Sequence, residues 1–255
     1  MRRKLGKHAP YFELIDAQGQ AGCPICRLAS KAAARYLDSI LYEAVLDPDV
    51  RAKLKRSRGF CTIHVKMLLD RRGRALGIAL IYRDIIGAVA EAIDKGHHET
   101  RGVFHARLLR KRRNSPAIAD MLTADQPCPA CAIGEEAEDS YVDLLLAHLR
   151  DDRFHMAYVQ GEGLCLPHFL RCLERVDDEK ISQRLVDPQI TRYRLMIGEL
   201  DEFIRKRDHR FRQEKYGEEG DVWLRAMNAI TGGVGLGFSA KKEGSRLSDF
   251  ESEEG

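Results

Sequence analysis

The sequence lacks any apolar run long enough to cross a membrane. Its most apolar stretch, residues 78–93, is interrupted by Arg83, Asp84 and Glu91, whereas a membrane-spanning helix needs about 20 predominantly apolar residues. No apolar segment follows the basic residues 1–4, as an export signal would require. We therefore expect no membrane association and a cytoplasmic location, where thiols remain reduced.

Alternating apolar and polar residues, the pattern of a half-buried strand, are also missing over any useful length. Apolar residues instead recur every three or four positions, as on one face of a helix, for example at Ile78, Ile81, Ile85 and Val89. The pattern predicts an all-α protein whose long amphipathic helices pack as a bundle. The expected helices cover residues 27–46, 48–58, 61–69, 78–96, 133–149, 152–160, 166–175, 188–215 and 223–230.

Motifs of the common enzyme classes are missing as well. The sequence contains no HExxH motif, and its histidines are otherwise scattered. The glycine-rich residues 232–237 follow an expected helix rather than a strand, and no Lys-Ser/Thr pair follows them. We therefore predict no catalytic residues and no enzymatic activity, and we interpret residues 232–255 as a flexible tail.

The charge balance does not by itself indicate a nucleic-acid-binding protein. Lysine and arginine total 42, aspartate and glutamate total 39, and the net charge is +3. Two local basic clusters, residues 71–74 and 107–113, could face phosphate groups, or they could be solvated helix surfaces. Aromatic residues do not interleave with these arginines, so a platform for stacking single-stranded bases is not indicated.

The sequence contains seven cysteines, and six of them belong to one motif that occurs twice. Each copy consists of a C-P-x-C sequence followed by a C-x-x-H sequence. In the first copy 34 residues separate the two parts, and in the second copy 33 residues separate them. The candidate ligands are Cys23, Cys26, Cys61 and His64 in the first copy, and Cys128, Cys131, Cys165 and His168 in the second.

Three thiolates and one imidazole suit tetrahedral zinc, and four protein ligands leave no coordination position for water or substrate. We expect two zinc ions per chain. An iron–sulfur cluster with one histidine ligand remains an alternative, as do a thioredoxin-like redox centre and a core of reduced cysteines. A c-type haem is disfavoured because Arg27 and Ala132, rather than histidine, follow the two C-P-x-C motifs.

The geometry around each ligand pair can also be predicted. Proline fixes φ within C-P-x-C and presets a tight turn, and C-x-x-H places its two ligands on one face of a starting helix. Gly59 and Gly163 each lie two residues before the C-x-x-H cysteine. We expect both glycines to permit a backbone approach that a β-carbon would block.

The two halves of the sequence match beyond the cysteines. At an offset of 105 residues Tyr36, Asp38 and Leu41 fall on Tyr141, Asp143 and Leu146, and after the loss of one residue an offset of 104 continues the match. This correspondence predicts two tandem, duplicated helical modules. We place them at residues 1–96 and 128–231, joined by a basic connector at residues 97–127.

Three further expectations follow from the repeat. We expect each metal site to form within one module, although pairing across modules is an alternative. Asp38 and Asp143 could hydrogen-bond the metal-binding histidines, or they could simply face solvent. Cys172, the seventh cysteine, falls on Leu68 of the first copy, which indicates a buried thiol in an apolar position.

The paired motifs, together with the helix between them that contains Tyr-Leu/Val-Asp, resemble an uncharacterised prokaryotic family classed as a domain of unknown function. The resemblance covers about residues 20–230. It implies two metal sites in a helical protein and supplies no activity. The sequence therefore predicts a non-enzymatic, zinc-binding interaction or regulatory module with a protein partner; a nucleic-acid-associated regulator and an iron–sulfur or thiol redox sensor are the alternatives.

Overall fold

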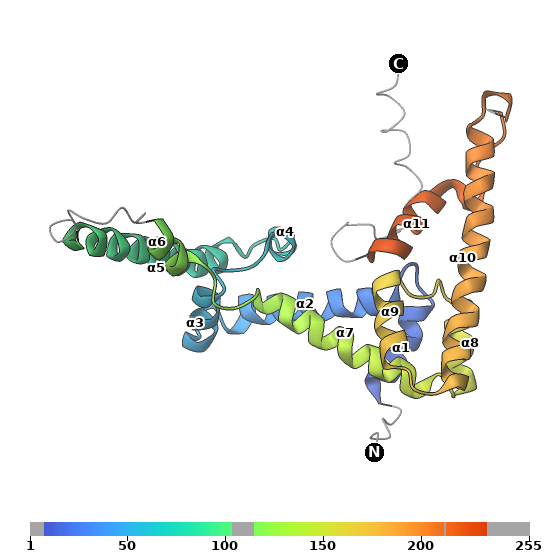
Figure 1. The fold of residues 1–255 in the computed structure, drawn as a ribbon, viewed down its shortest axis with the longest axis horizontal. Coiled ribbons are helices and arrows are strands. Elements are labelled where there is room, and N and C mark those ends of the chain that lie inside the picture. The colour runs from blue at the N-terminus through green and yellow to red at the C-terminus, as the bar shows by residue number, and fades with distance from the viewer. Residues whose placement is uncertain (1–7, 104–114, 212, 234–255) are drawn as a thin grey trace. The chain divides into compact units, whose positions relative to one another are not determined.

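The computed structural model describes residues 8–103, 115–211 and 213–233, and within these ranges it is all-α, without a strand, as predicted (Figure 1). None of the helices in the described ranges is both long and apolar enough to cross a membrane. The α-helices are α1 (Ala9–Gln18), α2 (Pro24–Glu43), α3 (Pro48–Arg56), α4 (Thr62–Leu69), α5 (Ala75–Val103), α6 (Ser115–Leu122), α7 (Pro129–His148), α8 (Asp152–Gln160), α9 (Leu166–Arg175), α10 (Glu179–Arg207) and α11 (Val222–Thr231).

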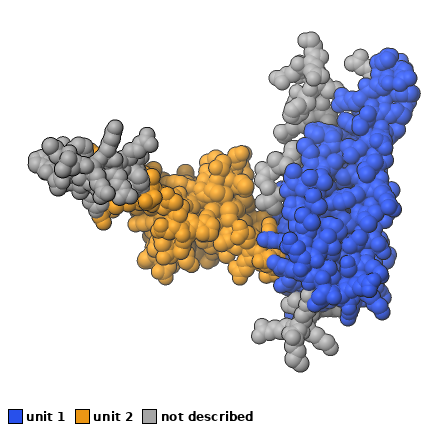
Figure 2. Space-filling view, in the orientation of Figure 1, with its two compact units in different colours: residues 1–28, 141–255 blue, residues 29–140 orange. Residues whose placement is uncertain are grey.

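The chain forms two compact units, which Figure 2 distinguishes by colour. Unit 1 comprises residues 1–28 and 141–255, and unit 2 comprises residues 29–140. The chain passes from unit 1 to unit 2 inside α2 and returns inside α7. This division differs from the expected ranges of 1–96 and 128–231, because both crossings lie within helices rather than in the basic connector.

The core of unit 1 is built from α1, α7 and α8, together with parts of α2, α9 and α10. Tyr11 and Phe154 are almost fully buried, and their ring centroids lie 5.4 Å apart. The side chains of Leu14, Leu145 and Leu149 fill the same cluster. Three of the motif cysteines belong to this cluster as well, so the core of unit 1 continues up to its candidate metal ligands.

The core of unit 2 lies among α2, α3, α4 and α5. The second half of α2 contributes Leu37 and Ile40, which pack with Leu54 of α3, Leu68 of α4 and Ile81 of α5. Only the start of α2, residues 24–28, belongs to unit 1. One helix of 20 residues therefore contributes to two separate cores.

The helices of the two halves recur at the offsets seen in the sequence. Helices α2 and α7 each have 20 residues, α3 and α8 each have nine, and α5 and α10 each have 29. The nine-residue helices both begin after an aspartate, Asp47 or Asp151, whose carboxylate accepts hydrogen bonds from backbone N–H groups of the first turn. That the two halves arose by duplication remains a prediction.

Several predicted helix limits are wrong, and the largest differences lie in α5 and α10; the end of α10 is Arg207 rather than residue 215. Helix α5 continues past Gly96 to Val103 and lies beside α6, and this packing outweighs the cost of about 1 kcal/mol that a helical glycine carries. Helix α10 begins at Glu179, not at Pro188, and Pro188 lies in its interior. Proline leaves the carbonyl of the residue four positions earlier without its helical donor. That carbonyl, on Arg184, lies 3.2 Å from Nε2 of His155, which satisfies it from α8.

Candidate metal centres

All eight predicted ligands lie in two groups, and each group holds three cysteines and one histidine. We name them by unit: the unit 1 site and the unit 2 site. Within each group the ligand atoms all lie within 4.8 Å of one another. The unit 1 site consists of Cys23, Cys26, Cys165 and His168, and the unit 2 site consists of Cys61, His64, Cys128 and Cys131.

The expected pairing within one half of the sequence is therefore wrong. Each C-P-x-C motif meets the C-x-x-H motif of the other half. Helix α2 explains the exchange, because its cysteines stand at its beginning, whereas Leu37 and Ile40 near its end pack in the unit that contains Cys61 and His64. A helix of 20 residues is about 30 Å long, so the cysteines at the start of α2 and the residues near its end cannot belong to one site.

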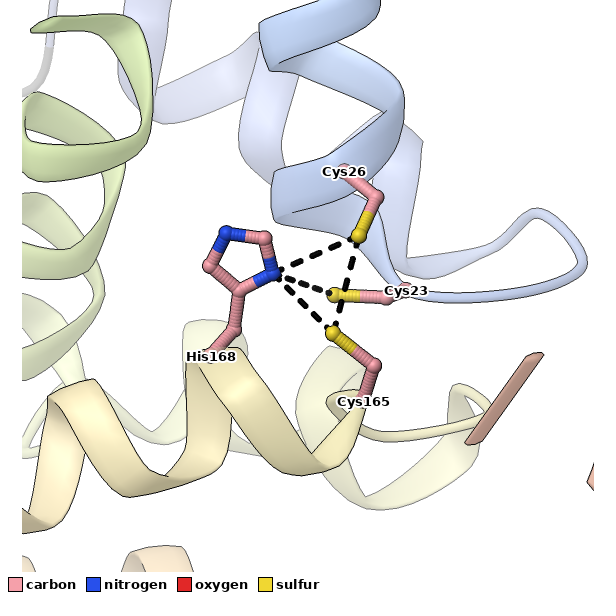
Figure 3. A group of neighbouring side chains, drawn as sticks. All are labelled: Cys23, Cys26, Cys165 and His168. Atoms are coloured by element: carbon pink, nitrogen blue, oxygen red, sulfur yellow. Dashed lines mark hydrogen bonds between the residues drawn. The ribbon is translucent and has the colours of Figure 1, made fainter. Parts of the chain in front are cut away.

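The unit 1 site is shown in Figure 3, where Nδ1 of His168 faces three sulfur atoms. Its distances to Sγ of Cys165, Cys26 and Cys23 are 3.1, 3.3 and 3.6 Å. The sulfur atoms of Cys26 and Cys165 are 3.6 Å apart. The site is buried, with exposed fractions between 1% for Cys165 and 9% for Cys23.

The unit 2 site has the same geometry. Nδ1 of His64 lies 3.2 Å from Sγ of Cys61, 3.4 Å from that of Cys131 and 3.6 Å from that of Cys128. The sulfur atoms of Cys61 and Cys131 are 3.6 Å apart. His64 is buried, but the three cysteines are partly exposed.

These distances fit one tetrahedral metal ion. With Zn–S bonds of about 2.3 Å and Zn–N bonds of about 2.0 Å, tetrahedral ligands stand about 3.8 Å apart when both are sulfur and about 3.5 Å apart when one is nitrogen. The observed separations of 3.1–3.6 Å are close to both values. They are far longer than a disulfide bond of about 2.05 Å.

Two helix N-termini meet at each site. Cys165 is the N-cap residue of α9 and Cys61 is that of α4, so each C-x-x-H motif opens a helix, as expected. The proline of each C-P-x-C motif is the first residue of α2 or α7, a position that suits its fixed φ. The expected tight turn is thus the first turn of a helix. The partial positive charges of two helix N-termini favour thiolates at each site.

The thiols of the unit 2 site strongly affect one another. Burial raises the pKa of Cys61, but hydrogen bonds from the backbone of His64, from the Cys131 and Cys128 thiols and from the backbone of Ile63 outweigh it and lower that pKa overall. Burial, with the neighbouring sulfurs of Cys61 and Cys128, raises the pKa of Cys131 to about 12. Burial also lowers the pKa of His64, which keeps the imidazole neutral as a metal ligand must be. A bound cation would relieve the repulsion among three adjacent thiolates.

A buried side-chain amide holds the loop that carries Cys165. Gln189 of α10 is 1% exposed, its Nε2 donates to the carbonyl of Leu164 at 2.8 Å, and its Oε1 accepts from the N–H of Leu164 at 3.0 Å. Gly163 has a φ of 79°, and a β-carbon there would lie 2.6 Å from Oε1 of Gln189. The predicted close approach is therefore confirmed at Gly163. It is wrong at Gly59, where a β-carbon would lie no closer than 3.4 Å to its neighbours, Ile85 and Tyr82.

Sequence reasoning did not identify Gln189. The available signal was its position on the buried face of α10, four residues after the fully buried Leu185. A second contact ties the loops before the two ligand pairs together, because the N–H of Gly22 donates to Glu162 at 2.6 Å. At the sequence offset of 104, Glu162 corresponds to Arg58 of unit 2. The Arg58 side chain donates to the carbonyls of Met121 and Leu122, which precede Cys128 in the sequence.

Asp38 and Asp143 pair with arginines. Arg71 lies 2.5 Å from Asp38, and Arg175 lies 3.1 Å from Asp143. The two arginines correspond at the offset of 104, so the same ion pair occurs in both units. Each joins the helix that follows C-P-x-C to the end of the C-x-x-H helix of the same half.

The basic clusters are only partly described. Arg71 is held by Asp38 and by backbone carbonyls of α2 and α4, and the guanidinium of Arg74 lies 3.4 Å from the ring centroid of Tyr42. At least these two arginines of the 71–74 cluster therefore have partners within the protein. The cluster at residues 107–113 lies outside the described residues.

Cys172 is fully buried in the core of unit 1, in the apolar position that its match with Leu68 predicts. Burial raises the pKa of its thiol to about 12, so the thiol is neutral at ordinary pH. It belongs to neither ligand group. Its role is that of a small apolar side chain.

The fold and the two ligand groups define an all-α protein with two candidate centres of the Cys3His type. A family of unknown function, DUF6062, matches residues 9–235, and the chain belongs to this family. It is also similar to an uncharacterized 23.9 kDa protein in the xynA 3' region of Caldicellulosiruptor sp. strain Rt8B.4, with 22% identity over 221 residues, which are 86% of this chain and 99% of the relative. No solved structure matches.

The two hydrogen bonds between the Gln189 side-chain amide and Leu164, which we call the amide clamp, yield a testable prediction. Gln189→Leu keeps the side-chain size but removes both hydrogen bonds to Leu164, so the unit 1 site should bind its metal roughly 10–100-fold more weakly. Competition with a chelator measures this, and the unit 2 site serves as the internal control. Unchanged affinity of the unit 1 site in a folded Gln189→Leu variant would show that the amide does not position Cys165.

Cys172, the seventh cysteine, yields a second prediction. Cys172→Ala removes one buried sulfur and should lower the free energy of unfolding by roughly 1–2 kcal/mol, the cost of a small cavity. The metal content should not change. Thermal unfolding and elemental analysis of the same preparation test both statements, and loss of metal would mean that Cys172 supports a ligand.

Proposed function

We propose that this protein is a zinc-binding helical protein, with one zinc ion in each unit, that acts as an interaction or regulatory module rather than as an enzyme. The observation that carries the proposal is the presence of two groups of three thiol sulfurs and one imidazole nitrogen, each within 4.8 Å. This donor set and spacing match the ligand shell of a structural zinc ion.

The spacing supports a single ion over an iron–sulfur cluster. In a cluster, thiolates bind different iron atoms, so the ligands spread around a larger body than one ion. Here the four donor atoms of each group lie within 4.8 Å of one another, and Figure 3 shows those of the unit 1 site facing one another. Zinc also prefers thiolate and imidazole donors in tetrahedral arrangement, without the redox chemistry that a cluster would bring.

Zinc at these sites would stabilise each unit by joining segments that are distant in sequence. The unit 1 site joins residues 23–26 to residues 165–168, and the unit 2 site joins residues 61–64 to residues 128–131. Closing such long loops costs entropy in the unfolded chain, so a metal cross-link between their ends should stabilise the folded state. Chelation should therefore lower the unfolding temperature.

A binding role, rather than catalysis, is supported by the ligand count and by the surface of α11. Four protein ligands occupy every tetrahedral position, so the site keeps no open position for water or substrate. Trp223, Met227 and Ile230 are 42%, 41% and 54% exposed and recur at helical spacing on one face of α11. An exposed apolar stripe of this kind is typical of a surface that a protein partner covers.

Three pairs of equally long helices, α2 and α7, α3 and α8, and α5 and α10, support an origin by duplication, which we also propose. Crosswise ligand pairing fits that origin if the ancestral single unit worked as a pair of chains. Each chain would then have supplied its C-P-x-C motif to the site of the other, as the two halves do here.

Elemental analysis of protein purified without added metal tests the proposed function. We expect two zinc ions per chain, and a strong chelator should remove them and lower the thermal midpoint. A preparation with iron as its main metal, or one that is fully folded without metal, would contradict the proposal. A Cys172→Ser variant provides the matched control, because it loses a cysteine outside both ligand groups.

A further inference from the structure

The two candidate centres share their ligand set but differ in their access to solvent. In the unit 1 site all three cysteines are at most 9% exposed, whereas in the unit 2 site all three are partly exposed. The residues just before Cys128, at positions 123–127, are exposed as well. The cysteines of the unit 2 site are therefore more open to solvent than those of the unit 1 site.

The end of α11 closes the unit 1 site. Gly232 follows α11 with a φ of 84°, and a β-carbon there would lie 3.4 Å from Sγ of Cys26 and 3.5 Å from Sγ of Cys165. We predict from sequence that Gly232 opens a flexible tail, but the residue is buried and its backbone packs on two of the ligands. Glycine allows this approach, because any side chain would point at the sulfurs.

The residues of unit 2 that correspond to α11 in the sequence do not form one helix. At the offset of 104, α11 falls on residues 118–127, which comprise the end of α6 and the exposed residues 123–127. Helix α6 packs beside α5. The Arg58 side chain donates hydrogen bonds to the carbonyls of Met121 and Leu122 at the end of α6.

The loop before Cys165 in unit 1 is also held by more side-chain hydrogen bonds from a neighbouring helix than the loop before Cys61 in unit 2. At the offset of 104, Gln189 falls on Ile85, which lies beside Gly59 and has no amide; the loop before Cys61 has instead one hydrogen bond within it, from the Ser57 hydroxyl to the carbonyl of Gly59 at 2.9 Å. The loop before Cys165 has two hydrogen bonds between Leu164 and Gln189 of α10. Hydrogen bonds and apolar packing around a site restrict the movement of its ligands and the entry of solvent.

From these differences we propose that the unit 2 site is a metal-exchange site, whereas the unit 1 site holds its metal permanently. The exchanging ligand would be a soft external donor, a thiol or a chelating nitrogen base. This proposal rests on the proposed function, since it requires metal at both sites.

The exchange step follows from the coordination chemistry of zinc, which can expand from four to five ligands. An external donor would bond to the metal beside Cys61, Cys128 or Cys131, and a thiol donor would lose its proton to solvent as it binds. One metal–sulfur bond to the protein would then break, and the freed thiolate would take up a proton from solvent. Repetition of the step would transfer the metal ion to the external ligand. No electron is gained or lost.

Metal release from the full-length, zinc-loaded protein tests the proposal. With an excess of the chromogenic chelator 4-(2-pyridylazo)resorcinol, zinc should leave in two phases of equal amplitude, whose rates differ by about tenfold or more. Cys131→Ser should remove the fast phase alone, and Cys26→Ser should remove the slow phase alone. Release of both ions in one phase, or a fast phase that Cys131→Ser retains, would overturn the proposal.

Alkylation of the unmutated protein gives a second readout that does not depend on the folding of any variant. With N-ethylmaleimide, Cys61, Cys128 and Cys131 should be modified together with loss of the first zinc ion, while Cys23, Cys26 and Cys165 stay protected. Cys172, which is fully buried, should also stay unmodified and so reports that the chain remains folded. Equal modification of both ligand sets would contradict the exchange role, whereas a starting preparation without two zinc ions would contradict the proposed function.

Discussion

The close approach of three thiols and one imidazole is the constraint on which the rest of this structure depends. Sulfur atoms 3.6 Å apart without a disulfide bond, such as those of Cys26 and Cys165, suit a shared cation, because adjacent thiolates repel one another. Two helix N-termini aimed at each site supply only partial positive charge. The four helices that carry the ligands begin at the two sites, so the sites set where α2, α4, α7 and α9 start.

Crosswise pairing distributes each half of the sequence over both units. Helices α2 and α7 each begin at one site and end in the core of the other unit, which ties each core to a ligand pair from the other half. The ion pairs Asp38–Arg71 and Asp143–Arg175 act differently, since each joins segments of the same half. Removal of one metal should therefore affect contacts made by both halves.

Much of this arrangement could be predicted from sequence, and the failures have physical causes. The ligands, the helices that start at C-x-x-H and the need for Gly163 follow from local chemistry, because spacing and residue type determine them. The pairing could not be predicted, since equal spacing in both halves allows either combination and only the packing of α2 decides between them. Pro188 in α10 and the amide clamp of Gln189 depend on tertiary partners, His155 and Leu164, which sequence periodicity does not reveal.

Metal counting in two double variants tests the crosswise pairing most directly. Cys23→Ser with Cys165→Ser removes two ligands from the unit 1 site alone, so this chain should retain one zinc ion. Cys23→Ser with Cys61→Ser removes one ligand from each site, so this chain should bind both ions weakly or not at all. Both variants lack two cysteines and thus control for each other. The opposite result, with one ion retained only when Cys23 and Cys61 are replaced, would show that each site forms within one half of the sequence.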